Sequence, residues 1–291
     1  MKRCVVRGMP EVFAHIAAAH LFCNGKILDS GKMKGNIMVF HSDLDNTLIY
    51  SYKHEIGLHK KCVEIYQGRE ISYMTDLSWE LLKKIQQQML FVPTTTRTIE
   101  QYQRIQLGNK PPEYALVCNG GILLHHGESD SNWYRESRRL VASCQADLFQ
   151  VEKLLKTDEN VNFEVRNIEN LFVFTKSAKP KQTMERLHKH LEGSQVELFS
   201  NGVKVYAVPR KLNKGEAVKR FRHRIAREIT VAAGDSRFDI PMLEEADLAL
   251  ARWELQKEQM GGKHVVYLGE KEIFSDEVLK YLLHRKPPKS T

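Results

Sequence analysis

The segment VFHSDLDNTLIY, residues 39–50, decides the fold, because a short apolar run ends there on two carboxylates. Residues 38–42 predict a buried strand. Asp43 and Asp45 follow it two residues apart, and like charges this close resist burial unless a cation or a shared proton stabilises them. The segment is therefore either an exposed turn or a site built around a metal ion.

Strands and helices alternate along the chain on both sides of this segment. Strands are predicted at residues 38–42, 89–93, 114–118, 229–235, 246–251 and 263–269. Helices are predicted at residues 79–90, 98–106, 214–228 and 241–246, the first of them capped by Asp76 or Ser78. A hairpin with arms at residues 61–66 and 70–74 interrupts the alternation. Strands that alternate with helices imply a parallel sheet that is covered on both faces.

A different pattern occupies residues 130–208. A helix is predicted within residues 140–156, a strand at 163–175 and a second helix at 181–192. A hairpin around Asn201-Gly202 follows them. This part of the chain is predicted to be a small α+β layer inserted into the larger domain.

Composition excludes several classes of protein. The net charge is +8, from 44 Lys and Arg against 36 Asp and Glu, but residues 1–37 contribute half of it. The nearly balanced remainder gives no case for a nucleic-acid groove. The sequence has no run of about 18 apolar residues, which a membrane-spanning helix would need. The five cysteines are odd in number and never in C-x-x-C spacing, which favours a cytoplasmic protein without disulfides or structural zinc.

The first 37 residues are basic and contain only two acids, Glu11 and Asp29. Their apolar stretch, residues 11–22, includes Glu and His and is a poor core for a signal peptide. We expect these residues to be a loosely packed extension that lies outside the core, with Met38 as an alternative start.

Residues suited to chemistry gather in four segments that we expect at the carboxyl ends of parallel strands, where open α/β sheets bind ligands. The segments are residues 43–47, 94–97, 214–215 and 234–239. They supply four carboxylates, several hydroxyls and one lysine, an inventory that suits Mg²⁺ with a phosphate opposite it. An ionised aspartate can attack phosphorus when a cation and a lysine neutralise the phosphoryl oxygens, and a second carboxylate can move protons.

The motifs, taken in order, resemble the haloacid dehalogenase (HAD) superfamily of aspartyl-phosphate phosphatases over residues 38–270. The inserted layer, the segment KGEAV at residues 214–218 and NGG at 119–121 are most similar to the Cof-type class IIB branch, which includes sucrose-phosphate and mannosyl-3-phosphoglycerate phosphatases. The resemblance implies a Rossmann-like α/β core with a parallel sheet, formed by residues 38–129 and 209–291. It also implies an α+β cap domain at residues 130–208.

The resemblance gives each motif residue a role. Asp43 is implied to be the nucleophile and a Mg²⁺ ligand, and Asp45 the general acid and base, whose backbone carbonyl also faces the metal. Asp235 is implied to bind Mg²⁺, and Asp239 to bind or orient it. Thr95 and Lys214 complete the implied catalytic set. The residues implied to bind the substrate phosphate are Thr95, Thr96, Arg97, Asn119 and Lys214, with Thr94 as the alternative to Thr95.

The sequence departs from the family pattern at three positions. Asn46 replaces a common glycine, which is tolerable because asparagine accepts left-handed backbone conformations. Thr96 stands where many relatives have glycine. Phe238 stands where they often have asparagine, so a polar contact near the site is missing and the choice of substrate is harder to predict.

Other candidate sites are set aside for physical reasons. His54 and His59 are five residues apart, whereas a zinc site on one helical face needs four. His125 and His126 are adjacent on a predicted strand and so are expected to point to opposite faces. The basic run at residues 219–227 is expected to be a solvated helix face, because Val218, Phe221, Ile225 and Ile229 form an apolar stripe. Cys118, at the end of a buried strand, is expected to pack and not to react.

The sequence therefore predicts a Mg²⁺-dependent phosphatase that acts on a small phosphorylated metabolite, a sugar or polyol phosphate by resemblance. Glu164, Arg166, Lys204 and Tyr206 are candidates for contact with the leaving group from the cap. A phosphomutase and a non-catalytic module that binds a phosphorylated ligand stay open as alternatives. We expect a monomer or homodimer that has a small phosphate ester as its partner and binds no nucleic acid or membrane.

Overall fold

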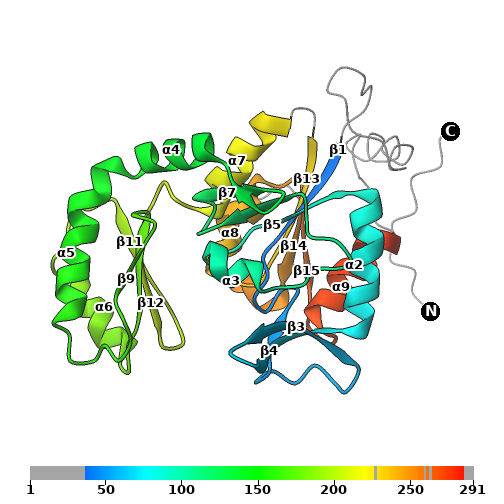
Figure 1. Cartoon of the computed structure of the whole chain (residues 1–291), viewed down its shortest axis with the longest axis horizontal. Coiled ribbons are helices and arrows are strands. Elements are labelled where there is room, and N and C mark those ends of the chain that lie inside the picture. The colour runs from blue at the N-terminus through cyan, green and yellow to red at the C-terminus, as the bar shows by residue number, and fades with distance from the viewer. Residues whose placement is uncertain (1–36, 226–227, 259, 262–263, 285–291) are drawn as a thin grey trace.

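The computed structural model describes residues 37–225, 228–258, 260–261 and 264–284. The extension was expected at residues 1–37; its residues 1–36 lie outside this part of the chain, as do the last seven residues, and residue 37 begins the first strand. The described residues form a core and a cap, which are joined at α4 and again between β12 and α7 (Figure 1). Helices long and apolar enough to cross a membrane do not occur among the described residues.

A five-stranded parallel sheet forms the centre of the core. Its strand order is β15-β14-β13-β1-β5. The strands are β1 (Ile37–Ser42), β5 (Leu90–Pro93), β13 (Glu228–Gly234), β14 (Leu248–Arg252) and β15 (Val265–Leu268). β1 pairs with β13 on one side and with β5 on the other, so the acidic segment begins beside the ends of both neighbours. The predicted parallel sheet is confirmed, except that residues 114–118, which were expected to form one of its strands, pair instead in a separate antiparallel sheet.

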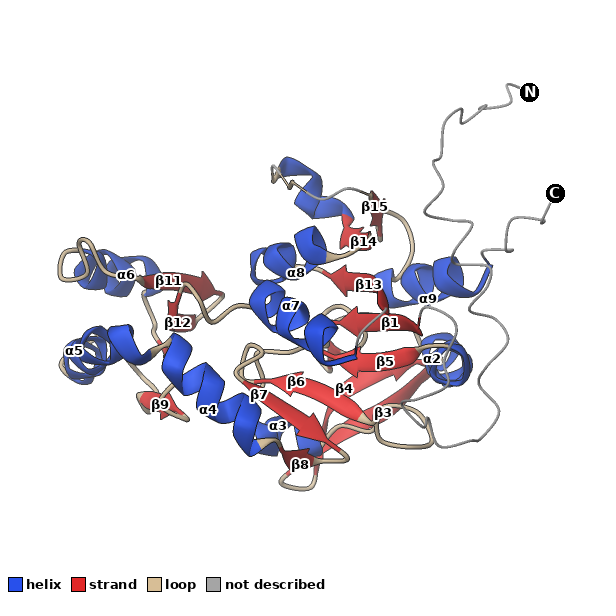
Figure 2. Cartoon of the chain, turned by 90° about the horizontal axis from the view of Figure 1, so that it is seen from above, coloured by secondary structure: helices blue, strands red, loops and turns tan. Residues whose placement is uncertain are grey.

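Helices cover both faces of this sheet (Figure 2). One face carries α2 (Asp76–Gln88) and α9 (Phe274–His284), and the other carries α7 (Lys214–Ile225) and α8 (Ile240–Glu245). Successive residues of β1 point to opposite faces, so Phe40 packs in the cluster with α2 and α9 while Val39 packs against α7. Apolar runs such as residues 38–40 are what a strand buried on both faces requires.

Shorter elements flank the sheet near the ends of β1 and β5. One antiparallel sheet has the order β2-β4-β3, with β2 (Tyr50–Ser51), β3 (Lys60–Tyr66) and β4 (Arg69–Thr75). Another has the order β6-β7-β8, with β6 (Tyr114–Val117), β7 (Ile122–His125) and β8 (Glu128–Ser129), and α3 (Ile99–Gln103) precedes it. The short helices η3 (Arg237–Asp239) and η4 (Trp253–Lys257) complete the core.

The cap consists of a four-stranded antiparallel sheet with the order β11-β12-β10-β9 and its helices. The strands are β9 (Arg166–Ile168), β10 (Phe172–Lys176), β11 (Val196–Asn201) and β12 (Lys204–Pro209). The helical segments are α4 (Ser131–Leu140), η2 (Ala142–Cys144), α5 (Gln145–Lys156) and α6 (Pro180–His188). Val205 and Ala207 pack with the cap helices, whereas Phe199 and Tyr206 pack against the core. One face of the cap sheet is therefore covered by the cap helices, and the other face lies over the core.

Three local predictions are wrong. The single strand predicted at residues 163–175 is two strands, because Glu169 and Asn170 have φ angles of 51° and 53° and form a tight turn. α2 is capped by Thr75, whose hydroxyl accepts a hydrogen bond from the Ser78 N–H. Ile229, expected on a helical stripe, lies in β13.

Candidate active site

The acidic loop begins immediately after β1. The Asp43 N–H donates to the Ala233 carbonyl at 2.9 Å, which fixes the first acid beside the end of β13. The Leu44 carbonyl accepts from the N–H groups of Thr47, Leu48 and Ile49, so the chain turns at once. Asn46 has a φ of 64°, a conformation that asparagine tolerates better than most residues. The loop thus holds Asp43 at the carboxyl edge of the sheet.

Three carboxylates and one lysine meet at this edge. Lys214 Nζ lies 2.5 Å from Asp43 Oδ1 and 2.6 Å from Asp239 Oδ1, and the Lys214 side chain is 1% exposed. Three carboxylate oxygens, one each from Asp43, Asp235 and Asp239, lie within 4.8 Å of one another. Residues separated by almost two hundred positions in the sequence therefore share one small volume.

Neighbouring donors orient these carboxylates. Thr47 Oγ1 donates toward Asp235 Oδ1 at 3.1 Å and lies 3.4 Å from Asp43 Oδ2. Asp239 Oδ2 accepts from the backbone N–H groups of Asp235 and Ser236 and from the Ser236 hydroxyl. A Cβ at Gly234 would lie 2.3 Å from Asp239 Cβ, so only glycine fits there. Both oxygens of Asp239 are thus engaged by protein donors.

The cluster carries excess negative charge. Burial, opposed by Lys214 and reinforced by Asp239 and Asp45, raises the pKa of Asp43 to about 7. Burial and the charges of Asp239 and Asp43 likewise raise the pKa of Asp235. Burial alone would lower the pKa of Lys214, but the two carboxylates raise it above its ordinary value. Three carboxylates against one ammonium leave a net charge of −2 when all are ionised, which a divalent cation would balance.

Asp45 belongs to a second, balanced set of charges. Arg97 Nε and Nη2 donate to Asp45 Oδ2 and Oδ1, both at 2.8 Å, and Arg97 Nη1 lies 2.8 Å from Glu64 Oε2. Glu64 also accepts from Arg104 and from the Ser72 hydroxyl. Burial would raise the pKa of Asp45, but the hydrogen bonds and charge of Arg97 lower it below its ordinary value. Arg97 therefore holds the acid in place with a bidentate fork.

Glu64 is a site residue that sequence reasoning missed. It lies on β3, whose pairing with β4 shifts register on both sides of Glu64, and its side chain is completely buried. A bulge re-aims a side chain that simple alternation would place on the solvent face. The sequence carries no signal for it, because a glutamate in a half-exposed hairpin is the ordinary pattern.

The remaining predicted residues are buried or half-buried. Thr95 is buried, its hydroxyl accepts from the Arg97 N–H at 3.2 Å, and its carbonyl accepts from the Asn119 N–H. Asn119 Nδ2 donates to the Leu212 carbonyl at 2.8 Å, while its buried Oδ1 has no hydrogen-bond partner. Thr94 bonds His41 within the sheet, and Thr96 is half-buried in the same loop as Thr95.

Lys214 does not follow a strand of the parallel sheet as expected. It is the first residue of α7, five residues after cap strand β12 ends at Pro209. A carbon on Gly215 would lie 2.3 Å from the Pro241 carbonyl oxygen, so the glycine lets α7 approach α8 closely. The lysine reaches the sheet edge because its helix packs there.

Aromatic side chains of the cap lie against Phe238 of the core. The Phe238 ring is 4.5 Å from that of Phe199 and 5.3 Å from that of Tyr206, between centroids. Tyr206 packs in turn against Phe174 at 5.0 Å. Burial, together with the charges of Asp45 and Asp43, raises the pKa of Tyr206, so this cap residue lies near both acids. Phe238 therefore makes apolar contacts with the cap at a position where the family resemblance led us to expect a polar residue.

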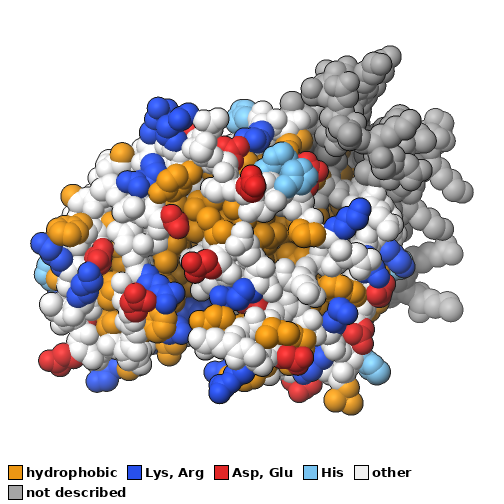
Figure 3. Space-filling model, in the orientation of Figure 1, with side chains coloured by type: hydrophobic (Ala, Val, Ile, Leu, Met, Phe, Trp, Pro, Cys, Tyr) orange, Lys and Arg blue, Asp and Glu red, His pale blue; other side chains and the backbone are white. Residues whose placement is uncertain are grey.

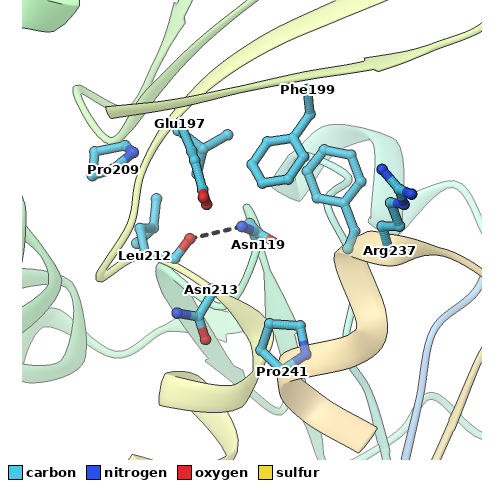
Figure 4. A pocket seen from close by; sticks show the side chains of 10 residues that line it. Asn119, Glu197, Phe199, Pro209, Leu212, Asn213, Arg237 and Pro241 are labelled. Atoms are coloured by element: carbon cyan, nitrogen blue, oxygen red, sulfur yellow. Dashed lines mark hydrogen bonds between the residues drawn. The ribbon is translucent and has the colours of Figure 1, made fainter. Parts of the chain in front are cut away.

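A small cavity of about 70 Å³ opens beside these rings (Figure 4). Its walls include Phe199, Asn119 and Asn213, and Glu197 points from the cap toward Asn119. On the face seen in Figure 3, hydrophobic side chains gather between the cap and the core. The cavity thus combines apolar rings with hydrogen-bond acceptors, next to the segment that carries Lys214.

Among the candidates set aside, one behaves as expected and one prediction is wrong. His54 and His59 belong to neither group of three potential metal ligands found among the described residues, and the expectation that they bind no zinc stays a prediction. Cys118 is buried, and burial raises the pKa of its thiol to about 12, which fits packing. His125 and His126 do not point to opposite faces, since their rings lie 4.3 Å apart, with His126 at a φ of 51°.

A model of the haloacid dehalogenase-like hydrolase family matches residues 11–252, a range that begins within the expected extension. No curated protein is significantly similar to the chain.

Among solved structures, the sucrose-phosphatase of Synechocystis sp. PCC6803, in complex with sucrose and phosphate, aligns with a TM-score of 0.61 and 19% identity. The alignment covers 86% of this chain and 98% of that one. A Thermoplasma acidophilum protein aligns with a TM-score of 0.55 and 11% identity, over 86% of this chain and 98% of that one. A trehalose-6-phosphate phosphatase related protein aligns with a TM-score of 0.51 and 16% identity, over 84% of this chain and 96% of that one. The chain belongs to the haloacid dehalogenase-like hydrolase family, which confirms the predicted superfamily, its α/β fold with an inserted cap, and the expectation that the protein is a hydrolase.

Proposed function

We propose that the protein is a Mg²⁺-dependent phosphatase that hydrolyses a small sugar or polyol phosphate through a phosphorylated Asp43. The observation that carries the proposal is the buried contact of Lys214 with Asp43 and Asp239, beside Asp235. A lysine placed on a nucleophilic carboxylate can also neutralise phosphoryl oxygens, and phosphoryl transfer depends mainly on such positioning and charge.

The donor set fits Mg²⁺. Carboxylate oxygens are the ligands that this hard cation prefers, and the cluster has the excess negative charge that a dication would balance. Asp43 and Asp235 are the proposed side-chain ligands, with the Asp45 carbonyl. Asp239 is proposed to orient Lys214, since both of its oxygens already accept hydrogen bonds. When bound, Mg²⁺ would withdraw charge from the transferred phosphoryl group.

The proposed chemistry has two steps. A carboxylate oxygen of Asp43 forms a bond to phosphorus, the bond from phosphorus to the leaving oxygen breaks, and Asp45 gives that oxygen its proton. Water then attacks the phosphorus of the acyl phosphate and gives a proton to Asp45. The bond between phosphorus and the Asp43 oxygen breaks, and inorganic phosphate leaves, which restores both residues. Thr95, whose hydroxyl hydrogen is not used in the Arg97 contact, is proposed to donate to the phosphate.

Arg97 is proposed to act through Asp45. Its fork binds both oxygens of the ionised acid, so Asp45 must loosen this pair to carry a proton. Family resemblance implies that Arg97 binds the phosphate of the substrate instead. The two roles are separable by experiment, because only the second predicts weaker binding of inorganic phosphate.

The cavity below the cap is proposed to receive the leaving group. Apolar rings can cover the carbon face of a sugar, and the carboxylate of Glu197 and the free Oδ1 of Asn119 can accept from its hydroxyls. The solved sucrose-phosphatase complex supports sugar phosphates as the first compounds to test. Lys204 and Tyr206 stay candidates for contact from the cap, whereas Arg166 pairs with Glu164. The cytoplasmic location and the monomeric or homodimeric state stay predictions.

The test is a panel of phosphate esters, assayed for released phosphate with Mg²⁺ and with EDTA. We expect hydrolysis with Mg²⁺ alone, its loss in Asp43→Asn, and its retention in the control Asp76→Asn, which changes an exposed acid on α2. Equal activity of Asp43→Asn and the wild type would refute the nucleophile. If no ester is hydrolysed, the non-catalytic module that binds a phosphorylated ligand is favoured. If the product keeps its phosphate when a bisphosphate activator is present, the phosphomutase is favoured.

A further inference from the structure

The turn between β7 and β8 brings two histidines together. His126 and Gly127 form this two-residue turn and have φ angles of 51° and 84°, the pair of positive values that a type I′ hairpin turn requires. Because His126 has left the extended conformation, its ring does not continue the alternation of the strand. Its centroid lies 4.3 Å from that of His125, with the planes tilted by 35°.

Glu113 adds a carboxylate to this pair. It immediately precedes β6, and its carbonyl accepts a hydrogen bond from the His126 N–H at 2.7 Å. Glu113 Oε1 lies 3.7 Å from His125 Nε2. One ligand atom from each of the three side chains lies within 4.8 Å of the others. Histidine side chains accordingly gather beside acidic ones on the face of the core seen in Figure 3.

Tyr114 packs against one member of the cluster. Its ring stacks on His125, the residue opposite it across the β6–β7 pair, at 4.5 Å and an interplanar angle of 7°. Packing of this kind orients a side chain that is to serve as a metal ligand.

We propose that Glu113, His125 and His126 bind a transition-metal dication of the zinc class, at a site separate from the acidic cluster. Imidazole nitrogens suit zinc, copper and nickel, whereas Mg²⁺ selects oxygen ligands, so the two sites differ in the ions they take. Three protein ligands leave a fourth position of a tetrahedral ion for water.

The geometry requires only small movements of the side chains. Bonds of about 2.0–2.2 Å in a tetrahedral site place neighbouring ligand atoms about 3.4 Å apart, close to the 3.7 Å between Glu113 and His125. His125 and Glu113 are 41% and 43% exposed, so both can adjust their rotamers. His126 is exposed at the turn.

The test is a Zn²⁺ titration of the full chain by calorimetry, with Mg²⁺ in excess to fill the acidic cluster. The variants are Glu113→Gln, which keeps the shape of the side chain, and His126→Asn, which keeps a residue that tolerates positive φ. Asp235→Asn is the matched control at the acidic cluster. We expect wild type and Asp235→Asn to bind one equivalent of Zn²⁺ that each of the first two variants binds at least about tenfold more weakly.

A second measurement uses only the wild-type protein, so it does not depend on whether a variant folds. Addition of Co²⁺ to the wild type should broaden the ring proton signals of His125 and His126 in NMR spectra before those of other histidines. The proposal is overturned if Glu113→Gln and His126→Asn keep the zinc equivalent, if only Asp235→Asn loses it, or if Co²⁺ broadens other histidines first.

Discussion

Replacement of Arg97 separates its two candidate roles. The side chain of Arg97 is 13% exposed and contacts Glu64, which is completely buried, and Asp45, which is 45% exposed. Removal of one partner of a buried pair costs about 3–5 kcal/mol. Arg104 and Ser72 would still contact Glu64, so we expect the lower end for Arg97→Ala. A loss of about 3 kcal/mol corresponds to a fall in Tm of roughly 6–12 °C.

The same variant should impair catalysis through Asp45. Without the fork, the acid loses its fixed orientation, and a misplaced group costs about 100-fold in rate. We therefore expect kcat of Arg97→Ala to fall about 100-fold, with KM and the inhibition constant of inorganic phosphate changed by less than about threefold. The defect should be smaller for p-nitrophenyl phosphate than for an alkyl phosphate, because the nitrophenolate leaves without a proton.

Arg104→Lys is the matched control, since Arg104 contacts Glu64 but is not bonded to Asp45. It should lower Tm and leave kcat near that of the wild type. Steady-state kinetics and thermal unfolding of the three proteins provide the comparison. A phosphate inhibition constant weakened more than about tenfold in Arg97→Ala, or an unchanged kcat, would refute the positioning role and favour direct phosphate binding.

Three further outcomes follow from the site and the cap. Mg²⁺ at about 100 times its Kd should stabilise the wild type by about 2.7 kcal/mol but not Asp235→Asn, as thermal shift would report; equal shifts would place the metal elsewhere. Gly234→Ala should lose activity, and its free energy of unfolding should fall by about 1–3 kcal/mol, because the added Cβ would overlap Asp239. Kinetic constants equal to those of the wild type would contradict this. In the cap, burial raises the pKa of Asp158, but bonds from Asn160 and Thr183 lower it overall. Its stabilisation is therefore full above its ordinary pKa of 3.8 and is lost as pH falls through the folded value, so unfolding midpoints of wild type and Asp158→Asn should converge in acid.

The sequence by itself determined the kind of fold and the residues of the acidic cluster. An apolar run that ends on charges, followed by alternating strands and helices, indicates a parallel sheet with a ligand edge, because periodicity and burial are local properties of the chain. The sequence alone was enough to select four residues of the site because they belong to recognisable motifs: Asp43, Asp235, Asp239 and Lys214. The structure brings these four together.

Only the tertiary structure decided the partners of these residues. Arg97 turned out to bind Asp45 and Glu64, a contact that depends on a bulge in β3 and on the packing of two separate segments. Sequence alternation also placed His125 and His126 on opposite faces, whereas a left-handed turn brings their rings together. Such contacts depend on backbone irregularities and on distances between remote segments, and neither leaves a periodic trace in the sequence.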